Sequence, residues 1–189
     1  LPSRGLGDVY KRQDLKASQT IAIFGMGPVG LSAVMLARSM GAKIIALDTN
    51  KQRLDRSIEF GADIIINPEE STDLLTQIKD HTKGLGVNAS IDASSSPSAR
   101  SNAVKCVKTW GKACFVGEGG EVTLDVSNDL LRRQVTLIGS WTFSKYGQAE
   151  CADFVAEKNL DVDQLFTHKW SLNQAVEAVS YTHLTLPTT

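Results

Sequence analysis

The sequence of 189 residues contains few cysteines and has no excess of either charge. Its three cysteines, Cys106, Cys114 and Cys151, are odd in number and show no C-x-x-C spacing. We therefore expect neither a disulfide framework nor a zinc cluster, but small, buried apolar side chains. The balance of 20 Lys and Arg against 21 Asp and Glu gives a formal net charge of −1. This charge favours attraction neither to nucleic acid nor to a membrane surface.

Long hydrophobic runs are missing as well. No apolar stretch approaches the roughly 20 residues needed to cross a bilayer, and no charged segment followed by an apolar one opens the chain. With 42% hydrophobic and 22% charged residues, the composition is that of one ordinary globular domain. The expectation is a cytoplasmic protein that binds neither membrane nor nucleic acid.

A glycine motif is the strongest signal in the chain. The apolar run Thr20–Phe24 ends at glycines spaced G-x-G-x-x-G, and a helix-compatible stretch follows. This context predicts a strand that turns into a helix around a dinucleotide pyrophosphate. The first glycine would permit the tight turn, the second the approach of the phosphates, and the third the close packing of helix on strand. The predicted pyrophosphate loop consists of Gly25, Gly27, Pro28, Val29 and Gly30.

A second apolar run, Lys43–Leu47, ends in Asp48, about 20 positions after the first glycine. A carboxylate there can accept hydrogen bonds from the adenosine ribose hydroxyls and would repel the 2′-phosphate of NADP, so we favour NAD. Arg53 can add a ribose or phosphate contact, or belong to a solvated helix face with its basic neighbours. The alternative role for Asp48 is an N-cap for the helix expected over residues 50–60.

Competing nucleotide sites are tested by the same residues. A P-loop needs lysine after its last glycine, where this chain has Leu31, so triphosphate binding is disfavoured. A Tyr-x-x-x-Lys pair for proton transfer is also missing, because Tyr10, Tyr146 and Tyr181 are followed four positions later by Asp, Glu and Thr. An S-adenosylmethionine-binding fold, which also combines a glycine loop with an acidic second strand end, stays open.

Strands and helices alternate along the chain. Predicted strands cover Thr20–Phe24, Lys43–Leu47, Asp63–Ile66, Ala89–Asp92, Lys112–Val116 and Val135–Ile138. Predicted helices lie near Val29–Met40, Lys51–Phe60, Thr72–Thr82, Pro97–Val107, Ser127–Arg133 and Tyr146–Glu157. This alternation predicts an α/β fold, a Rossmann-type doubly wound parallel sheet of about six strands in the order 3-2-1-4-5-6. Its cofactor would lie across the carboxyl ends of the first and fourth strands.

Both ends of the chain depart from this pattern. Residues 1–13 have no amphipathic period, and residues 181–189 interrupt the helical stretch Leu172–Val179 with threonine and proline. We expect these ends to be non-native, adapter-like tails around a dinucleotide-binding domain at residues 14–180. Native, frayed termini are the alternative.

Several motifs together resemble the coenzyme-binding domain of the medium-chain, zinc-dependent alcohol and polyol dehydrogenases, including the sorbitol and threonine dehydrogenase branches. The resemblance covers about residues 17–180. Its motifs are Gly-Met-Gly-Pro-Val-Gly at 25–30, Met40-Gly41-Ala42, Asp48 with Arg53 and Leu54, Gly61-Ala62-Asp63 with Asn67-Pro68, Gly84-Leu85-Gly86-Val87, Ile91-Asp92, Gly111 with Val116-Gly117, and Ile138-Gly139-Ser140.

The resemblance implies contacts for the rest of the dinucleotide. The loop after the fifth strand and the turn after the sixth are expected to present backbone groups to the nicotinamide carboxamide, and the segment after the fourth strand is expected to contact the adenine end. The loop after the fifth strand contains Val116, Gly117 and Glu118, and the turn after the sixth contains Gly139, Ser140 and Trp141. The segment after the fourth strand contains Ala93 and Ser94. In the family the segment after the fourth strand often reads Cys or Thr, then Ser and Gly, so this chain departs from the pattern there.

The resemblance also implies a zinc-dependent reaction whose metal ligands belong mainly to a separate catalytic domain. No such ligand motif occurs in this chain; His168 is expected to be a packing residue at a domain junction. We therefore expect a fragment that binds NAD without catalysing, with the catalytic domain absent and a homo-oligomer possible. The alternatives are a freestanding NAD-binding regulatory or redox-sensing module and a zinc-free quinone reductase of the same superfamily.

Overall fold

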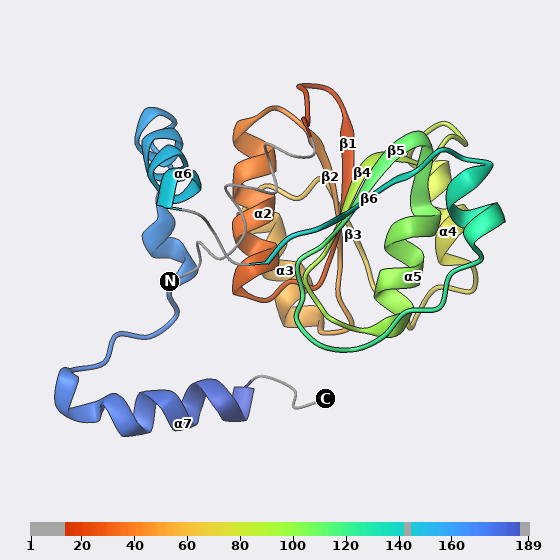
Figure 1. Ribbon diagram of the computed structural model, residues 1–189. Coiled ribbons are helices and arrows are strands. Elements are labelled where there is room, and N and C mark those ends of the chain that lie inside the picture. The colour runs from red at the N-terminus through yellow and green to blue at the C-terminus, as the bar shows by residue number, and fades with distance from the viewer. Residues whose placement is uncertain (1–13, 142–144, 186–189) are drawn as a thin grey trace.

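The computed structural model describes residues 14–141 and 145–185, and its centre is a six-stranded sheet in the order β3-β2-β1-β4-β5-β6 (Figure 1). Every neighbouring pair of strands is parallel. The predicted Rossmann-type α/β fold and its strand order are confirmed. The strands are β1 (Thr20–Phe24), β2 (Lys43–Leu47), β3 (Ile64–Ile66), β4 (Val87–Asp92), β5 (Val107–Phe115) and β6 (Thr136–Gly139).

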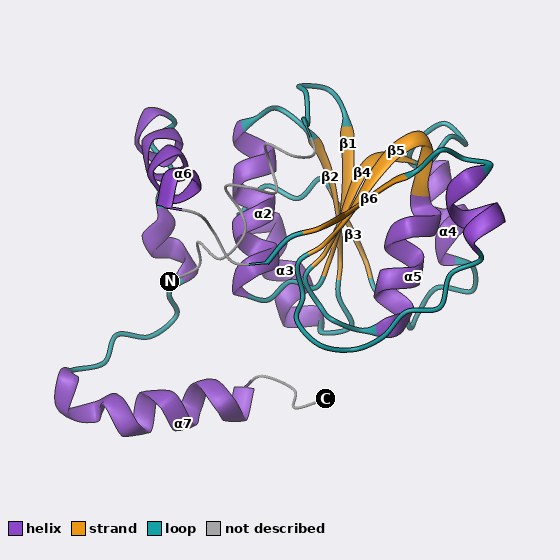
Figure 2. Ribbon diagram, viewed as in Figure 1, coloured by secondary structure: helices purple, strands orange, loops and turns teal. Residues whose placement is uncertain are grey.

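Helices cover both faces of this sheet (Figure 2). The first face is covered by α2 (Pro28–Ser39) and α3 (Lys51–Glu59), and the second by α4 (Leu74–Asp80) and α5 (Pro97–Cys106). Successive residues of a strand point to opposite faces, so in β1 the side chains of Ile21 and Ile23 join one buried cluster and that of Phe24 joins the other. Burial on both faces explains why the neighbouring strands β1 and β2 are almost wholly apolar.

β5 is longer than expected. We predicted a start at Lys112, but Val107 already pairs with Val87, and the register shifts before the next pairing resumes. Within this irregular stretch Trp110 adopts a φ of 62° and its backbone N–H donates to the carbonyl of Arg133. The predicted start was wrong because the spacing of apolar residues does not reveal that Trp110 adopts a left-handed backbone conformation.

Two helical predictions also need correction. The stretch expected as an α-helix over Ser127–Arg133 is a π-helix, η1 (Val126–Leu131), that follows the N-cap Asp125. The helix expected to end at Val179 continues as α7 (Ala175–Thr185) and includes Tyr181. Residues 1–13 and 186–189 of the expected tails lie outside the described residues.

The remaining elements follow the sheet in the sequence. α6 (Lys145–Glu157) lies on the side of α2, and Phe154 and Val155 pack against the first buried cluster (Figure 1). Two short 3-10 helices follow, η2 (Val162–Leu165) and η3 (Leu172–Gln174), and α7 then lies apart from the sheet layers in the same view. Within the described residues, the structure has no helix long and apolar enough to span a membrane.

Candidate dinucleotide-binding site

The ends of five strands form one row across the sheet. The pairings join Leu47 to Phe24, Phe24 to Asp92, Asp92 to Phe115 and Phe115 to Gly139. The residue that follows each strand therefore lies at the same edge. These following residues are Asp48, Gly25, Ala93, Val116 and Ser140, all of which were predicted from the sequence to contact the cofactor.

The glycine loop connects β1 to α2 at the middle of this edge. Gly25 has a φ of 91°, in the left-handed region, and its N–H donates to the carbonyl of Leu47 at 2.7 Å. A Cβ at Gly30 would overlap the carbonyl oxygen of Gly25, so a side chain there would separate the helix from the loop. Both glycines are explained by contacts within the chain.

Gly27 is different, because nothing within the described structure requires it to be glycine. Its φ of −73° is ordinary for any residue, and a Cβ at this position would meet no atom within 4 Å. Gly27 is also the N-cap of α2, and no side chain caps this helix. The first turn therefore presents its N–H groups and the positive end of the helix dipole beside a position that adds no side chain, which is an arrangement that suits phosphate oxygens.

Asp48 links the glycine loop to the end of β2. One carboxylate oxygen accepts the N–H of Met26 at 2.6 Å and the other accepts the N–H of Asn50 at 2.8 Å. The N-cap of α3 is Asn50, whose side chain accepts the N–H of Arg53 at 3.1 Å, so Asp48 does not itself cap the helix. The half-buried Asp48 carboxylate keeps further lone pairs with which ribose hydroxyls could bond. Arg53, also half-buried, lies in the first turn of α3.

The segment after β4 packs directly on the glycine loop. A Cβ at Gly25 would approach the backbone and Cβ of Ser94 to within 2.9 Å. The Ser94 N–H and hydroxyl donate to one oxygen of Asp92 at 3.0 and 2.7 Å. Ser95 follows with a φ of 67°, a left-handed conformation that costs a non-glycine residue roughly 1–2 kcal/mol. Ser95 thus adopts a left-handed conformation at the position where the pattern described above has glycine.

The segments after β5 and β6 complete the edge. The N–H of Val116 and that of Gly117 donate to the carbonyl of Asp92 at 2.9 and 3.0 Å, and the N–H of Ser140 donates to the carbonyl of Phe115 at 3.0 Å. Ser140 is buried, whereas Gly139 and the side chains of Glu118 and Trp141 are exposed, the last by 64%. These hydrogen bonds all join backbone groups, whereas the side chains of Glu118 and Trp141 are exposed to solvent.

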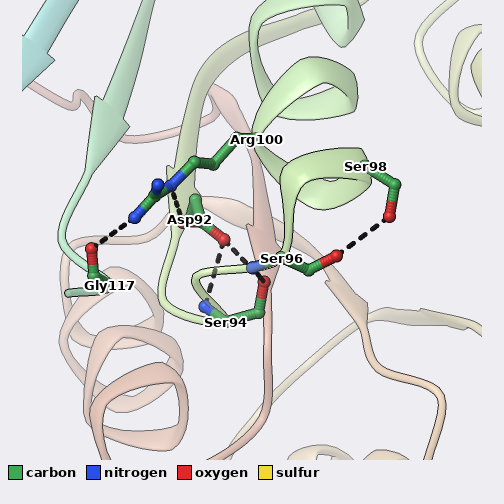
Figure 3. A network of polar contacts seen from close by, with 6 residues as sticks. All are labelled: Asp92, Ser94, Ser96, Ser98, Arg100 and Gly117. Carbon is green, nitrogen blue, oxygen red and sulfur yellow. Dashed lines mark hydrogen bonds and ion pairs between the residues drawn. The ribbon is translucent and has the colours of Figure 1, made fainter. Parts of the chain in front are cut away.

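Sequence reasoning missed a buried ion pair below the edge (Figure 3). The Arg100 guanidinium donates through Nε to Asp92 at 3.3 Å, with side-chain exposures of 8% and 0%. A signal for it was available: Arg100 lies three and four positions before the buried Ala103 and Val104, which places it on the inward face of α5. A cation on such a face requires a buried partner.

Comparison with known proteins shows what the chain is related to. The family described as zinc-binding dehydrogenase matches residues 28–158, more than half of the chain. The chain belongs to this family.

Relatives of this zinc-binding dehydrogenase chain are longer than it is. The uncharacterized zinc-type alcohol dehydrogenase-like protein YphC of Escherichia coli K12 is 33% identical over 180 residues, which cover 93% of this chain and 51% of that protein. A sorbitol dehydrogenase of Bacillus subtilis is 33% identical over 171 residues, which cover 89% of this chain and 48% of that protein. The structure of benzyl alcohol dehydrogenase from Acinetobacter calcoaceticus superposes with a TM-score of 0.84 at 27% identity. The superposition covers 98% of this chain and 52% of that structure. The chain thus spans about half the length of the relatives it matches.

The family name implies zinc. In residues 14–141 and 145–185, no group of three or more His, Cys, Asp or Glu side chains could hold a metal ion. His168 instead packs with the rings of Trp170 and Tyr181. Burial raises the pKa of the Cys106 thiol to about 12 and keeps it protonated, unlike a metal-binding thiolate. The described residues do not fit a zinc centre.

Proposed function

We propose that this chain binds NAD(H) across the carboxyl ends of β1 and β4 and positions the nicotinamide for hydride transfer with an alcohol or polyol. Nicotinamide accepts or releases the hydride, and the zinc and substrate groups of the whole protein would belong to a further domain. The observation that supports this best is Gly27, a glycine at a helix N-terminus that no contact within the described structure explains.

Each segment of the edge would hold one part of the dinucleotide. The N–H groups at the start of α2 would bind the pyrophosphate, and Asp48 and Arg53 the adenosine ribose. The backbone of Val116–Glu118 and Gly139–Trp141 would bind the carboxamide and so fix which face of the ring is presented. By itself the chain would bind the cofactor and leave an alcohol unoxidised.

Asp48 supports NAD over NADP. At about 4 Å, repulsion between its carboxylate and one charge of a 2′-phosphate is worth about 1 to 4 kcal/mol, or roughly 5- to 1000-fold in affinity, for effective dielectric constants between those of water and a protein surface. An uncharged ribose would instead donate hydrogen bonds to the carboxylate. We therefore expect NAD to bind more tightly than NADP by at least roughly fivefold.

Calorimetric titration of the unmutated chain with NADH, NADPH and S-adenosylmethionine tests the proposal. The expected result is tight binding of NADH, weaker binding of NADPH and none of S-adenosylmethionine. Equal affinity for the two dinucleotides would overturn the role of Asp48 and favour a quinone-reductase-like protein. Binding of S-adenosylmethionine alone would overturn the proposed binding of NAD(H).

A further inference from the structure

The ion pair between Asp92 and Arg100 has a position that stability alone does not explain. Both side chains are removed from solvent, Asp92 at the end of β4 and Arg100 in the first turns of α5. Desolvation makes such a pair a weak source of net stability, and apolar residues of similar size often serve as well. This pair lies at the edge of the sheet that carries the candidate site, where a fixed pair of charges can orient the neighbouring backbone.

The pair holds Gly117 from two sides, as Figure 3 shows in part. The Gly117 N–H donates to the backbone carbonyl of Asp92 at 3.0 Å. Its carbonyl accepts a hydrogen bond from Arg100 Nη2 at 2.8 Å. The guanidinium is a rigid fork, so fixing its Nε on Asp92 also fixes the direction in which it can hold Gly117.

The chain after Gly117 folds closely around the same guanidinium. Gly119 and Gly120 have φ values of 79° and 70°, and a Cβ at Gly120 would lie 3.3 Å from Arg100 Nη1. On its other side the guanidinium lies over the ring of Phe115, 5.6 Å from its centroid. Arg100 therefore contacts the segment after β5 at Gly117 and lies close to its backbone at Gly120.

We propose that Arg100 is a positioning residue for the nicotinamide half of the bound dinucleotide, acting through the backbone of Gly117. The inference rests on the proposed NAD-binding function. Arg100 itself bonds to Asp92 Oδ2 and to Gly117. The adenosine half has other supports: the start of α2 and Asp48 are held by the glycine loop and by β2, and Ser94 is held by the second oxygen of Asp92. Removal of Arg100 should therefore weaken contacts with nicotinamide and leave those with ADP-ribose.

The test compares NAD with ADP-ribose, which lacks only the nicotinamide, in the unmutated chain and in Arg100→Lys. Lysine keeps a charge beside Asp92 but has a single ammonium group, so it cannot hold Asp92 and Gly117 in the same fixed geometry. We expect the affinity for NAD to fall roughly tenfold, as for the loss of one hydrogen bond to a charged group. The affinity for ADP-ribose should change less than about twofold, within the effect of an ordinary distant substitution.

Arg38→Lys is the matched control, since Arg38 also meets an aspartate, Asp63, at 3.3 Å but on the exposed side of the fold. It should leave both affinities unchanged. Equal losses for NAD and ADP-ribose in Arg100→Lys, or no loss for either, would overturn the positioning role. A chain with native Arg100 that binds neither ligand would instead overturn the proposed function.

Arg100→Met is a second variant, which removes the charge together with both hydrogen bonds of the guanidinium. Its cooperative thermal unfolding reports whether the fold survives with Asp92 unpaired, and the double variant Asp92→Asn with Arg100→Met removes the lone charge. In whichever variant unfolds cooperatively, NAD should again lose more affinity than ADP-ribose, and a parallel loss would contradict the inference.

Discussion

Replacement of Gly27 by alanine should weaken NAD binding at least roughly tenfold while leaving the fold intact. A methyl group at this position meets no atom within 4 Å, and the φ of −73° and ψ of −172° are accessible to alanine. Alanine is a poorer N-cap than glycine by about 0.5 kcal/mol or somewhat more. Alanine also lowers the conformational entropy of the unfolded chain, which stabilises the folded state by about 0.4–1 kcal/mol and offsets this loss. The free energy of unfolding should change by less than about 1 kcal/mol, which shifts the Tm of a chain this long by no more than roughly 4 °C.

The effect on the cofactor should be much larger than the effect on stability. The methyl group would occupy the surface over which phosphate oxygens approach the N–H groups of α2. Loss of one hydrogen bond to a charged group corresponds to about 1.5–3 kcal/mol, or roughly 10- to 150-fold in the Kd. Gly27→Ala should therefore bind NADH at least tenfold more weakly than the unmutated chain.

Gly30→Ala is the contrasting variant in the same loop. Its methyl group would overlap the carbonyl oxygen of Gly25, so helix and loop must move apart. Overpacking of this kind typically costs about 1–3 kcal/mol, and the Tm should fall by roughly 2–12 °C. Titration with NADH and thermal unfolding of both variants separate the two effects. A Gly27→Ala protein with unchanged NADH affinity would refute the reasoning, because the phosphates would then not cross this surface.

Three further results are expected from other parts of the chain. In Asp48→Ser the ratio of NADPH to NADH dissociation constants should fall toward one because the repelling charge is gone; an unchanged ratio in parallel titrations would contradict this. Hydrogen bonds from the side chain and backbone of Thr76 lower the pKa of Asp73 below its usual 3.8, so its stabilising effect is present above about pH 4 and is lost as the pH falls through the lowered value. Denaturation by urea between pH 4 and 2 should show a flatter pH dependence in Asp73→Asn, and an identical slope would argue against the cap. Because burial raises the pKa of Cys106 to about 12, a thiol reagent at pH 8 should leave it unlabelled in the folded chain and label the half-buried Cys151 slowly; rapid labelling of Cys106 in peptide mass spectra would contradict its burial.

The strand order could be predicted because the residues that specify it are local and strongly patterned. Apolar strands and helices alternate, and right-handed crossovers leave few arrangements for such a chain. The edge of the sheet was predictable for the same reason: Asp48 and Gly25 each follow a strand, and parallel strands bring such positions together. Of the three cysteines expected to be buried, Cys106 and Cys114 are buried and Cys151 is only half-buried.

What escaped prediction depends on single contacts or on backbone strain. The irregular start of β5 is set by Trp110 in a left-handed conformation that its side chain disfavours. The π-helix of η1 differs from an α-helix only in hydrogen-bond register, which the apolar pattern does not encode. The partnership of Arg100 with Asp92 joins two elements whose packing had to be known before the pair could be recognised.

The most direct test of the central claim is a map of amide chemical-shift changes in the ¹⁵N-labelled chain when NADH is added. If the cofactor lies across the carboxyl ends of the strands, the largest changes will occur at Gly27, Asp48 and Gly117. Changes confined to the opposite end of the sheet, at residues such as Asn88 and Lys108, would contradict the account. An unchanged spectrum at saturating NADH would contradict it equally.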